Sequence, residues 1–525
     1  MAQINVNNLT FYYDGSSDNI FENVSFSIDT NWKLGFIGRN GKGKTTFLKL
    51  LLGKYEYQGN IQTNTVFDYF PYELSPQHKN TCAADFMEEL KANCESWRVI
   101  RELDKLKADA EILYRPFETL SHGERTKVML AILFSGENDF LLIDEPTNHL
   151  DQNSRKMVKE YLAQKSGFIL VSHDRDLLDA CTDHVLVLNR HSIEVQSGNF
   201  SSWWENKRRK DSFVQMENEK HLKEIGMLKK AAAQTKQWAD KNEGTKIGYD
   251  PIKEHDRCKS TRAFIGAKTK KMQSRVLQIE NRINREIEEK EGLLQDIENP
   301  VDLKITPLQH HKDVYLTLAQ YGLKYDDSQA FVFNDLSFEL RQGERIFLNG
   351  KNGCGKSSLI KSILMHIAEV KQESPKMHTA AAAHQESPKM NITERGMMQV
   401  ASNLTVSYIN QDTSFLKGSI RNFCSGRNLD ESLFCAILRQ LDMERIQFTK
   451  NMEDFSEGQK KKVLIAASLL TPAHLYIWDE PLNYIDIFSR MQIEKLLLEH
   501  PSTMLIVEHD VKFQEKIATK FIDIG

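Results

Sequence analysis

Long apolar runs are missing from this sequence. No stretch of 18 or more consecutive apolar residues occurs among the 525 residues, so no membrane-spanning helix is predicted. The opening residues, MAQINVNNLT, also lack the basic segment and following apolar segment that a secretory signal requires. We therefore expect a cytoplasmic protein.

Cysteine is scarce, and neither positive nor negative residues are in large excess. The seven cysteines are scattered and never form a Cys-x-x-Cys pair, which argues against a disulfide framework or a cysteine-based zinc site. The formal net charge of −4 indicates no basic partner surface for the chain as a whole, so any such surface must be local. A chain of this length, 40% hydrophobic, is expected to form two or three globular units with connectors.

What is present is a repeat. The segments KLGFIGRNGKGKTT and RIFLNGKNGCGKSS each place an apolar strand before a Gly-x-x-x-x-Gly-Lys-Thr/Ser P-loop. In such loops glycines let backbone N–H groups surround phosphates at a helix N-terminus, while the lysine neutralises charge and the hydroxyl binds Mg²⁺. The predicted ATP-binding residues are Gly38, Asn40, Gly41, Gly43, Lys44, Thr45 and Thr46, and in the second copy Gly350, Asn352, Gly353, Gly355, Lys356, Ser357 and Ser358.

Two adjacent carboxylates follow an apolar strand in each copy, in FLLIDEPTNHLD and LYIWDEPLNYID. Such a pair is costly unless a cation or a proton transfer employs it. Asp144 and Asp479 are therefore candidate Mg²⁺ ligands, and Glu145 and Glu480 are candidates for polarising the attacking water. The further candidate metal-site residues are Thr45, Ser357 and Gln411.

Two more motifs keep the same order in both copies, namely ETLSHGERTK with EDFSEGQKKK, and ILVSHDRD with LIVEHDVK. Over residues 1–203 and 313–525 the set resembles the nucleotide-binding domains of ABC ATPases. The resemblance implies that His173 and His509 contact the γ-phosphate. It also implies that Lys44 shares one ATP with Ser456 and Gly458 (site 1), and Lys356 shares another with Ser121 and Gly123 (site 2). The family's aromatic adenine contacts would be Tyr13 and Tyr325.

The two copies depart from the family pattern in different ways. Tyr72 stands where a Q-loop glutamine is usual, whereas the second copy has Gln411. His122 replaces a signature glycine, and Leu482 and Tyr484 replace threonine and histidine. We expect the two sites to hydrolyse ATP at unequal rates. The repeated QESPKM at residues 372 and 385 indicates a surface loop without chemistry.

The segment between the copies is charged and helix-forming. Apolar residues spaced by threes and fours from Met272 to Ile297 predict one long helix. Residues 206–239 are expected to form its antiparallel partner, with Phe213, Met216, Leu222, Ile225 and Leu228 at the seam. At 1.5 Å per residue each helix would be about 50 Å long. The fold class is therefore α/β, with two ABC-type P-loop ATPase domains, residues 1–204 and 313–525, joined by an α-helical hairpin linker over residues 205–312.

The hairpin tip, about residues 241–265, is basic. Between residues 220 and 275 fifteen lysines and arginines stand against six acids, a local net charge of +9. Interleaved aromatic residues make this the composition that contacts phosphates and stacks on exposed RNA bases, although a solvated helix face is the plain alternative. The candidate ribosome-contacting residues are Lys241, Lys246, Tyr249, Arg257, Lys259, Arg262 and Phe264.

Two fused ATPase halves with this arm resemble the ABC-F family of ribosome-binding ATPases. Phrases such as YRPFETLSHGE, GFILVSHDR and WDEPLNYID are similar to its Lsa-type antibiotic-resistance branch. That resemblance implies a functional monomer that hydrolyses ATP with Mg²⁺. It further implies binding to the E site of the 70S ribosome, with the arm directed along 23S rRNA towards the P-site tRNA and the peptidyl transferase centre. Lincosamides, pleuromutilins and streptogramin A would thereby be displaced.

Three other functions remain open. A housekeeping ABC-F translation factor would share every ATPase motif and the ribosome. The ATPase subunit of a membrane transporter would need separate membrane subunits, and no spans or coupling partner are indicated here. A DNA-repair ATPase with coiled arms would carry a zinc hook or far longer coils.

Overall fold

The computed structural model describes residues 3–13, 19–92, 94–136, 140–148, 150–189, 192–244, 274, 277–279, 281–283, 285, 304–326, 330–372 and 392–524. They fall into two compact units. One contains Met1–Trp203 together with Pro300–Gly525, and the other is Trp204–Asn299. The first unit holds two α/β domains of like topology and the second is helical, which confirms the predicted fold class. The predicted boundaries at residues 204, 205, 312 and 313 stay a prediction.

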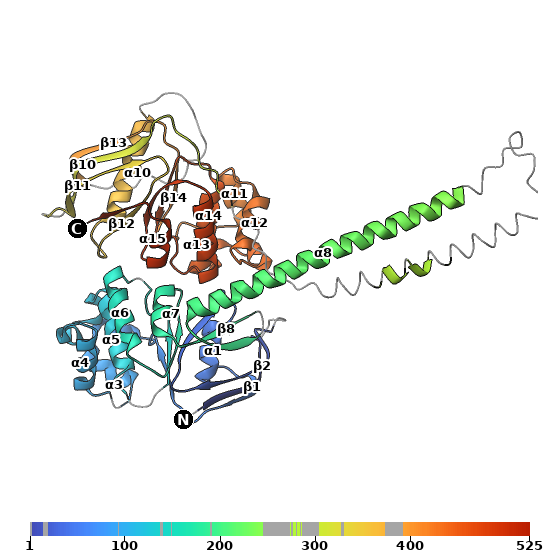
Figure 1. The fold of residues 1–525 in the computed structure, drawn as a ribbon. Coiled ribbons are helices and arrows are strands. Elements are labelled where there is room, and N and C mark those ends of the chain that lie inside the picture. Colours follow the sequence, from blue (N-terminus) through green and yellow to red (C-terminus); the bar gives the residue numbers. More distant parts are fainter. Residues whose placement is uncertain are drawn as a thin grey trace, which may run out of the picture. The chain divides into compact units, whose positions relative to one another are not determined.

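The first domain contains two sheets (Figure 1). The antiparallel sheet has the order β2-β1-β4 and consists of β1 (Gln3–Phe11), β2 (Phe21–Asp29) and β4 (Gln58–Gln62). The larger sheet has the order β5-β6-β7-β3-β8-β9, and all its pairs are parallel except β8 with β9. Its strands are β3 (Lys33–Gly38), β5 (Phe67–Phe70), β6 (Phe140–Asp144), β7 (Phe168–Val171), β8 (His184–Leu188) and β9 (Ile193–Ser197).

Helices cover the larger sheet and extend beyond it. They are α1 (Lys44–Leu51), α2 (Pro76–Asn80), α3 (Ala83–Leu90), α4 (Ser96–Lys105), α5 (His122–Leu133), α6 (Gln152–Ala163) and α7 (Arg175–Cys181), with 3₁₀ turns η1 (Ala110–Tyr114) and η2 (Phe117–Thr119). The continuous apolar runs of β6 and β7 are buried along their length. Burial on both faces is typical of central parallel strands, so the sequence pattern and the topology agree here.

The second domain repeats this plan. Its antiparallel sheet, β11-β10-β13, contains β10 (Val314–Tyr325), β11 (Phe333–Arg341) and β13 (Ile392–Val400). Its parallel sheet, β14-β15-β16-β12-β17, contains β12 (Arg345–Asn349), β14 (Val406–Ile409), β15 (Leu475–Asp479), β16 (Thr503–Val507) and β17 (Lys520–Asp523). The helices are α10 (Lys356–Gln372), α11 (Ile420–Gly426), α12 (Glu431–Gln440), α13 (Glu457–Leu470), α14 (Ile487–Glu499) and α15 (Val511–Ile517), with η3 (Arg445–Thr449) and η4 (Met452–Asp454).

The parallel sheets position the chemistry. In each domain the P-loop, the paired carboxylates and the motif histidine follow three neighbouring strands, β3, β6 and β7 in the first and β12, β15 and β16 in the second. Because the carboxyl ends of parallel strands meet at one edge, residues more than 100 positions apart converge there. Asp144 pairs in register with Val171, two residues before His173.

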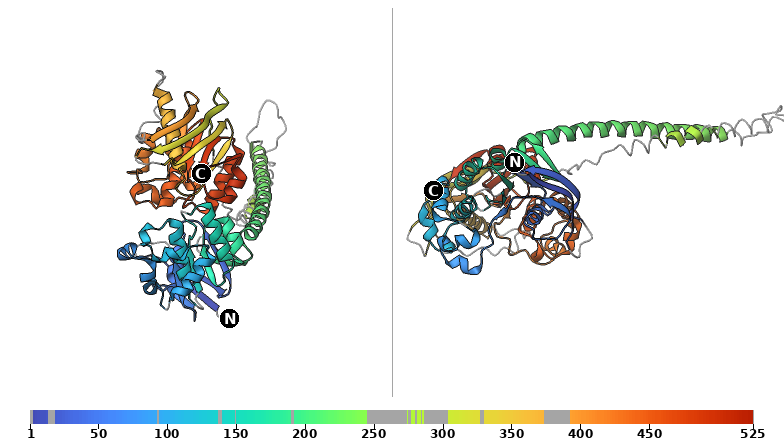
Figure 2. Two further views of the ribbon diagram at one scale, coloured as in Figure 1. Left: turned by 90° about the vertical axis from the view of Figure 1, so that its left-hand side faces the viewer. Right: turned by 90° about the horizontal axis from the view of Figure 1, so that it is seen from below.

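Most of the described residues of the second unit belong to the long helix α8 (Phe200–Gly244), whose first residues, Phe200 to Trp203, are in the first unit; α8 runs without interruption in both views of Figure 2. Its 45 residues span about 68 Å. The helix is longer than the predicted 206–239 and includes Lys241, which was predicted for the tip loop.

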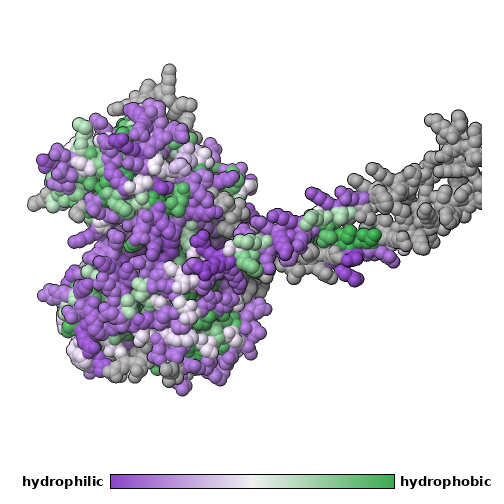
Figure 3. Space-filling view, viewed as in Figure 1, coloured by the Kyte–Doolittle hydropathy of each residue, from purple (hydrophilic) through white to green (hydrophobic). Residues whose placement is uncertain are grey.

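The surface in Figure 3 is mainly hydrophilic, with apolar patches on the arm. None of the helices in the described ranges is long and apolar enough to cross a membrane.

The seam predicted for α8 is partly wrong. Phe213, Met216 and Leu222 are 61%, 68% and 55% exposed, whereas Ile225 is buried and Leu228 is half-buried. The less exposed stripe instead runs through residues 207, 211, 214, 218, 221 and 225, most of them polar. An apolar pattern interrupted by many charged residues left the phase of the helix ambiguous. On the second predicted helix Ile279 is 46% exposed and Ile283 is half-buried.

Candidate ATP sites

Each P-loop makes a sharp turn that admits glycine alone at one position. Gly43 has φ +106°, and a Cβ placed on it would lie 2.5 Å from Ile20 Cγ2. Gly355 has φ +99° and the same crowding, 2.5 Å from Val332 Cγ1. Both glycines directly precede the lysine that begins the helix. The glycine spacing therefore reflects a backbone requirement of this turn.

The P-loop lysines point back into their own loops. Lys44 Nζ donates to the carbonyl oxygens of Gly38 at 2.7 Å and Arg39 at 3.1 Å. Lys356 Nζ makes the matching bonds to Gly350 at 2.8 Å and Lys351 at 2.9 Å. Burial lowers the pKa of Lys44, against the nearby carboxylates that raise it. The ammonium group of each lysine is thus held at the strand-to-helix turn, where a phosphate would lie.

The residues at the predicted metal sites fit Mg²⁺. Thr45 Oγ1 donates to Asp144 Oδ2 at 2.8 Å, and Ser357 hydrogen-bonds Asp479 in the same way. Burial raises the pKa of both aspartates. Asp479 Oδ1 is buried and has no hydrogen-bond partner among the described residues. Hydroxyl and carboxylate oxygens are the donors that Mg²⁺ prefers, and the ion would neutralise phosphate charge there.

The two glutamates share an unusual backbone conformation. Glu145 has φ +51° and Glu480 φ +48°, which is rare outside glycine. Glu145 accepts from the His173 backbone N–H at 3.4 Å, and its Oε1 lies 3.3 Å from His173 Nε2. In the second domain Glu480 Oε1 lies 3.9 Å from His509 Nε2. Strain of this kind is found where a side chain must be aimed at a reacting group.

Burial sets the protonation of these groups. It raises the pKa of Glu145 to about 8, aided by the charge of Asp144. It raises the pKa of Glu480 less, to about 6, with Glu508 and Asp479 as the next contributions. Burial also lowers the pKa of His173 well below its usual value and that of His509 to about 3. Both imidazoles are therefore neutral near pH 7. The two glutamates differ from each other in pKa.

The Q-loop position separates the two sites. In register Phe70 pairs with Ile143 and Ile409 with Trp478, which makes Tyr72 the counterpart of Gln411. Gln411 Nε2 donates to Glu480 Oε2 at 2.9 Å, and Asn483 Nδ2 adds a second bond at 2.7 Å.

Tyrosines occupy this region in the first domain. Tyr72 donates to Asp68 at 2.7 Å, whereas Tyr69 donates to Asp144 Oδ2 at 3.2 Å. Tyr69 and Asn483 were not predicted from the sequence. Tyr69 lies in the four-residue strand FDYF. Nothing in that short sequence indicates that its hydroxyl contacts Asp144.

The predicted adenine contacts lie beside the first turn of the P-loop helices. Tyr13 is 41% exposed, and its hydroxyl hydrogen-bonds Thr46 Oγ1 at 2.9 Å. Tyr325 makes the equivalent bond to Ser358 Oγ at 2.6 Å. The ring of Tyr13 also meets that of Tyr55 edge to face at 5.7 Å. Each phenol is thereby fixed next to the nucleotide turn, with part of its surface free for a base.

Ser121 and Ser456 begin helices α5 and α13. Each closes a capping box, with Glu124 in the first domain and Gln459 in the second. The glycines two residues later approach other segments closely. A Cβ on Gly458 would lie 2.7 Å from the carbonyl oxygen of Tyr484. The two helix N-termini therefore present backbone N–H groups and a serine hydroxyl, which suits an anion.

Contacts between the domains bring each P-loop to the opposite half. Asn40 Nδ2 donates to the carbonyl oxygen of Tyr484 at 2.7 Å, so Tyr484 lies between P-loop 1 and Gly458. Burial would raise the pKa of Asp151, but hydrogen bonds from Ser154 and from the Asn352 backbone outweigh it and lower the pKa. Asp151 of the first domain is thereby joined to P-loop 2. The pairing of Lys44 with Ser456 and of Lys356 with Ser121 is compatible with these contacts.

Two ion pairs reinforce the contact at site 1. Arg39 Nη1 lies 2.8 Å from Asp442 Oδ1, and Lys42 Nζ lies 2.7 Å from Glu444 Oε1. Both cations belong to P-loop 1 and both carboxylates to the second domain. Partly exposed pairs of this kind contribute little individually to stability, but they orient the loop.

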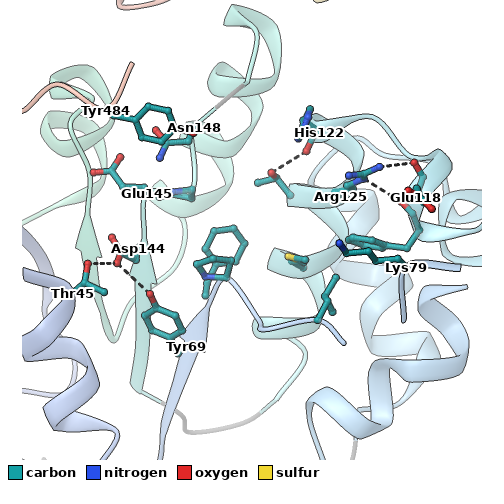
Figure 4. A pocket seen from close by; sticks show the side chains of 17 residues that line it. Thr45, Tyr69, Lys79, Glu118, His122, Arg125, Asp144, Glu145, Asn148 and Tyr484 are labelled. Carbon is teal, nitrogen blue, oxygen red and sulfur yellow. Dashed lines mark hydrogen bonds between the residues drawn. The ribbon is translucent and has the colours of Figure 1, made fainter. Parts of the chain in front are cut away.

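A cavity of about 660 Å³ adjoins site 1. Figure 4 shows Thr45, Asp144 and Tyr69 on one side and His122 and Arg125 on the other. Its remaining lining is Phe70, Pro71, Leu74, Lys79, Phe117, Glu118, Thr126, Met129, Glu145, Pro146, Asn148 and Tyr484. His122, which replaces the signature glycine, thus lines the same cavity as the first domain's own carboxylates, Asp144 and Glu145.

The predicted arm tip cannot be placed in this way. Lys246, Tyr249, Arg257, Lys259, Arg262 and Phe264 lie outside the described residues. The second QESPKM copy and most of the first lie outside them as well, since α10 ends at Gln372 and β13 begins at Ile392.

The model of the family described as ABC transporter matches residues 21–148 and 333–483, which is more than half of the chain. The matches begin at β2 and β11, one strand before the strand that leads into each P-loop, and end after the paired carboxylates. They therefore cover the P-loop, the signature motif and the paired carboxylates of both copies, and they end before His173 and His509.

Named relatives extend the similarity along the chain. The ribosome protection protein VmlR of Bacillus subtilis is 26% identical over 509 residues, covering 96% of this chain and 84% of that protein. The energy-dependent translational throttle protein EttA of Escherichia coli is 25% identical over 547 residues, covering 96% and 89%. Among solved structures, the complex of archaeal ribosomal stalk protein aP1 with recycling factor aABCE1 superposes with a TM-score of 0.58 at 16% identity, covering 98% and 87%. That structural likeness shows the fold.

Proposed function

Because the chain belongs to the ABC family and is an ATPase of the ABC-F type, with two ABC domains, we propose that it protects ribosomes from antibiotics. In this proposal the ATP-bound form binds the E site of the 70S ribosome. Its arm reaches towards the P-site tRNA and the peptidyl transferase centre and displaces lincosamides, pleuromutilins and streptogramin A. ATP hydrolysis then releases the protein into the cytoplasm.

One observation carries the proposal. The similarity to the ribosome protection protein covers 96% of this chain, so it includes the arm as well as the ATPase domains. The arm is also where the charge lies, with a net +9 between residues 220 and 275 in a chain of net −4. A basic segment of this kind binds nucleic acid phosphates by releasing counterions. The partners proposed for it are 23S rRNA and the P-site tRNA.

The two ATP sites supply the switch. Each combines a P-loop with the opposite domain, through Asn40 with Tyr484 and through Asp151 with Asn352. ATP bound at both sites would hold the domains together, because its γ-phosphate is contacted from both. Glu145 and Glu480 would activate the water, with His173 and His509 beside them. Loss of the γ-phosphate would remove the shared contact and open the clamp.

Deletion of the tip tests the proposal. Removing residues 244–260 should leave ATP hydrolysis unchanged and abolish protection of a sensitive bacterium against a lincosamide and a pleuromutilin. A deletion of the same length in the repeated QESPKM segment, residues 373–389, should leave both unchanged. Protection that survives removal of the tip would exclude the arm as the effector.

Charge variants of the tip separate binding from protection. Replacing Lys246 and Lys259 by glutamine should reduce the slope of log affinity for 70S ribosomes against log salt by about two. The matched control is Lys107→Gln, whose side chain pairs with Glu160 on the surface of the first domain at 2.9 Å. An unchanged slope in the tip variant would contradict an electrostatic role for the arm.

A housekeeping translation factor is the second candidate. The similarity to EttA has nearly the same identity and also spans 96% of this chain. This function predicts ATP-dependent ribosome binding without any change in drug tolerance. Expression in a drug-sensitive strain therefore distinguishes the two functions.

A further inference from the structure

A cluster of buried charges lies where the two ABC domains meet, outside both ATP sites. At its centre is Arg175, the first residue of α7, which is 4% exposed. Its guanidinium donates to both carboxylate oxygens of Glu494 on α14, one of them at 3.2 Å. It also lies 3.7 Å from Asp510 Oδ1. A residue of the first domain thus forms a forked ion pair with the second.

The position of Arg175 in the chain connects it to the chemistry. It is the second residue after His173, and Asp510 directly follows His509. Asp510 Oδ1 caps α15 by accepting the Phe513 N–H at 3.0 Å, so its carboxylate is fixed at the end of that loop. Arg175 therefore joins the two loops that carry the motif histidines of site 1 and site 2.

Both carboxylates of the cluster would keep a cationic partner if Arg175 were replaced. Glu494 keeps Lys516 of its own domain, with Nζ at 3.0 Å, and Asp510 keeps Arg490 at 2.9 Å. Because the desolvation of a buried arginine offsets much of the attraction in its ion pairs, such a pair is weak evidence for a role in stability alone. The second copy has no arginine at the equivalent position. The residue two positions after His509 is Val511.

We infer that Arg175 is a positioning residue that couples the two ATP sites. A shift of the loop at His173 pulls on Glu494 and Asp510, and so on the loop at His509. A guanidinium fork transmits such a shift better than a lysine would, because two parallel bonds fix both distance and orientation. Hydrolysis at one site consequently depends on whether the other site is closed.

The test uses the full chain without ribosomes, so it rests on the ATPase activity alone. Wild-type hydrolysis is divided by the sum of the rates of Glu145→Gln and Glu480→Gln, each of which leaves one site active. This coupling ratio equals 1 for independent sites. We expect the wild-type ratio to be at least about fivefold above or below 1, which is in the range of known allosteric coupling. In Arg175→Met/Glu494→Met, which removes the pair without leaving a buried charge unpaired, the ratio should return to near 1.

Two controls make the result specific. Lys516→Met removes the other partner of Glu494 within one domain and should leave the ratio at its wild-type value. Arg175→Lys retains the charge and so the fold, and should give an intermediate ratio. A wild-type ratio of 1, or a ratio that both Arg175 variants leave unchanged, would overturn the inference. Because ribosomes are absent, that outcome would leave the proposed ribosomal function untouched.

Discussion

Silencing one ATP site at a time should give two hydrolysis profiles with different pH dependence. Glu480→Gln leaves hydrolysis to site 1 and its Glu145, while Glu145→Gln leaves it to site 2 and its Glu480. A glutamate that activates water must be ionised, so activity at its site rises as pH increases through its pKa. The two variants therefore report two separate ionisations.

The structure gives the size of the difference. Burial, with the charge of Asp144 next, raises the pKa of Glu145 to about 8, while burial, with Glu508 and Asp479 next, raises that of Glu480 to about 6. This separation of the two pKa values corresponds to roughly 3 kcal/mol in the free energy of ionisation. At pH 7 site 1 would be about 10% ionised and site 2 about 90%. Mg²⁺ bound at a site would lower the pKa of that site's glutamate through its positive charge.

The assay is steady-state phosphate release from pH 5.5 to 9 at saturating Mg·ATP, with nucleotide binding measured at each pH as a control. The half-maximal pH of the Glu480→Gln variant should exceed that of Glu145→Gln by one unit or more. At pH 7 site 2 should be the faster site. Coincident profiles, or a site 1 that titrates at lower pH than site 2, would refute the argument from burial.

Two further changes at site 1 have expected magnitudes. Gly43→Ala should abolish ATP binding at this site in a filter or fluorescence assay, because its φ of +106° and the 2.5 Å approach of Ile20 leave no room for a methyl group; normal affinity would show that the turn is more tolerant than the structure indicates. Tyr69→Phe removes the 3.2 Å hydrogen bond to Asp144, about 1 kcal/mol, and should raise the Mg²⁺ concentration needed at this site about fivefold. The control Tyr408→Phe, whose hydroxyl donates to Asn410 instead, should leave the Mg²⁺ requirement of site 2 unchanged, and equal effects of the two changes would contradict the assigned role.

The parts of the sites that lie close in the chain could be predicted from the sequence. Each P-loop contains, within six residues, glycines that adopt a positive φ. The paired carboxylates directly follow an apolar strand. Both signals are local, and the parallel sheet then brings the strand ends together. Thr45 and Asp144 lie within hydrogen-bond distance for this reason.

Contacts between the domains left no such signal. Arg175 and Glu494 are 319 residues apart, and neither stands in a pattern that indicates a partner. The phase of α8 was misjudged because Phe213 and Met216 fit an apolar spacing, although the structure leaves both exposed. On a helix rich in charged residues, spacing alone does not reveal which stripe is covered.

The central claim is that ATP bound at both sites closes the chain into its ribosome-binding form. Its most direct measurement is the pelleting of the Glu145→Gln/Glu480→Gln variant with 70S ribosomes in ATP, in ADP and without nucleotide. The account predicts stable association in ATP alone, which weakens as salt is raised. Equal pelleting under all three conditions, or none in ATP, would contradict it.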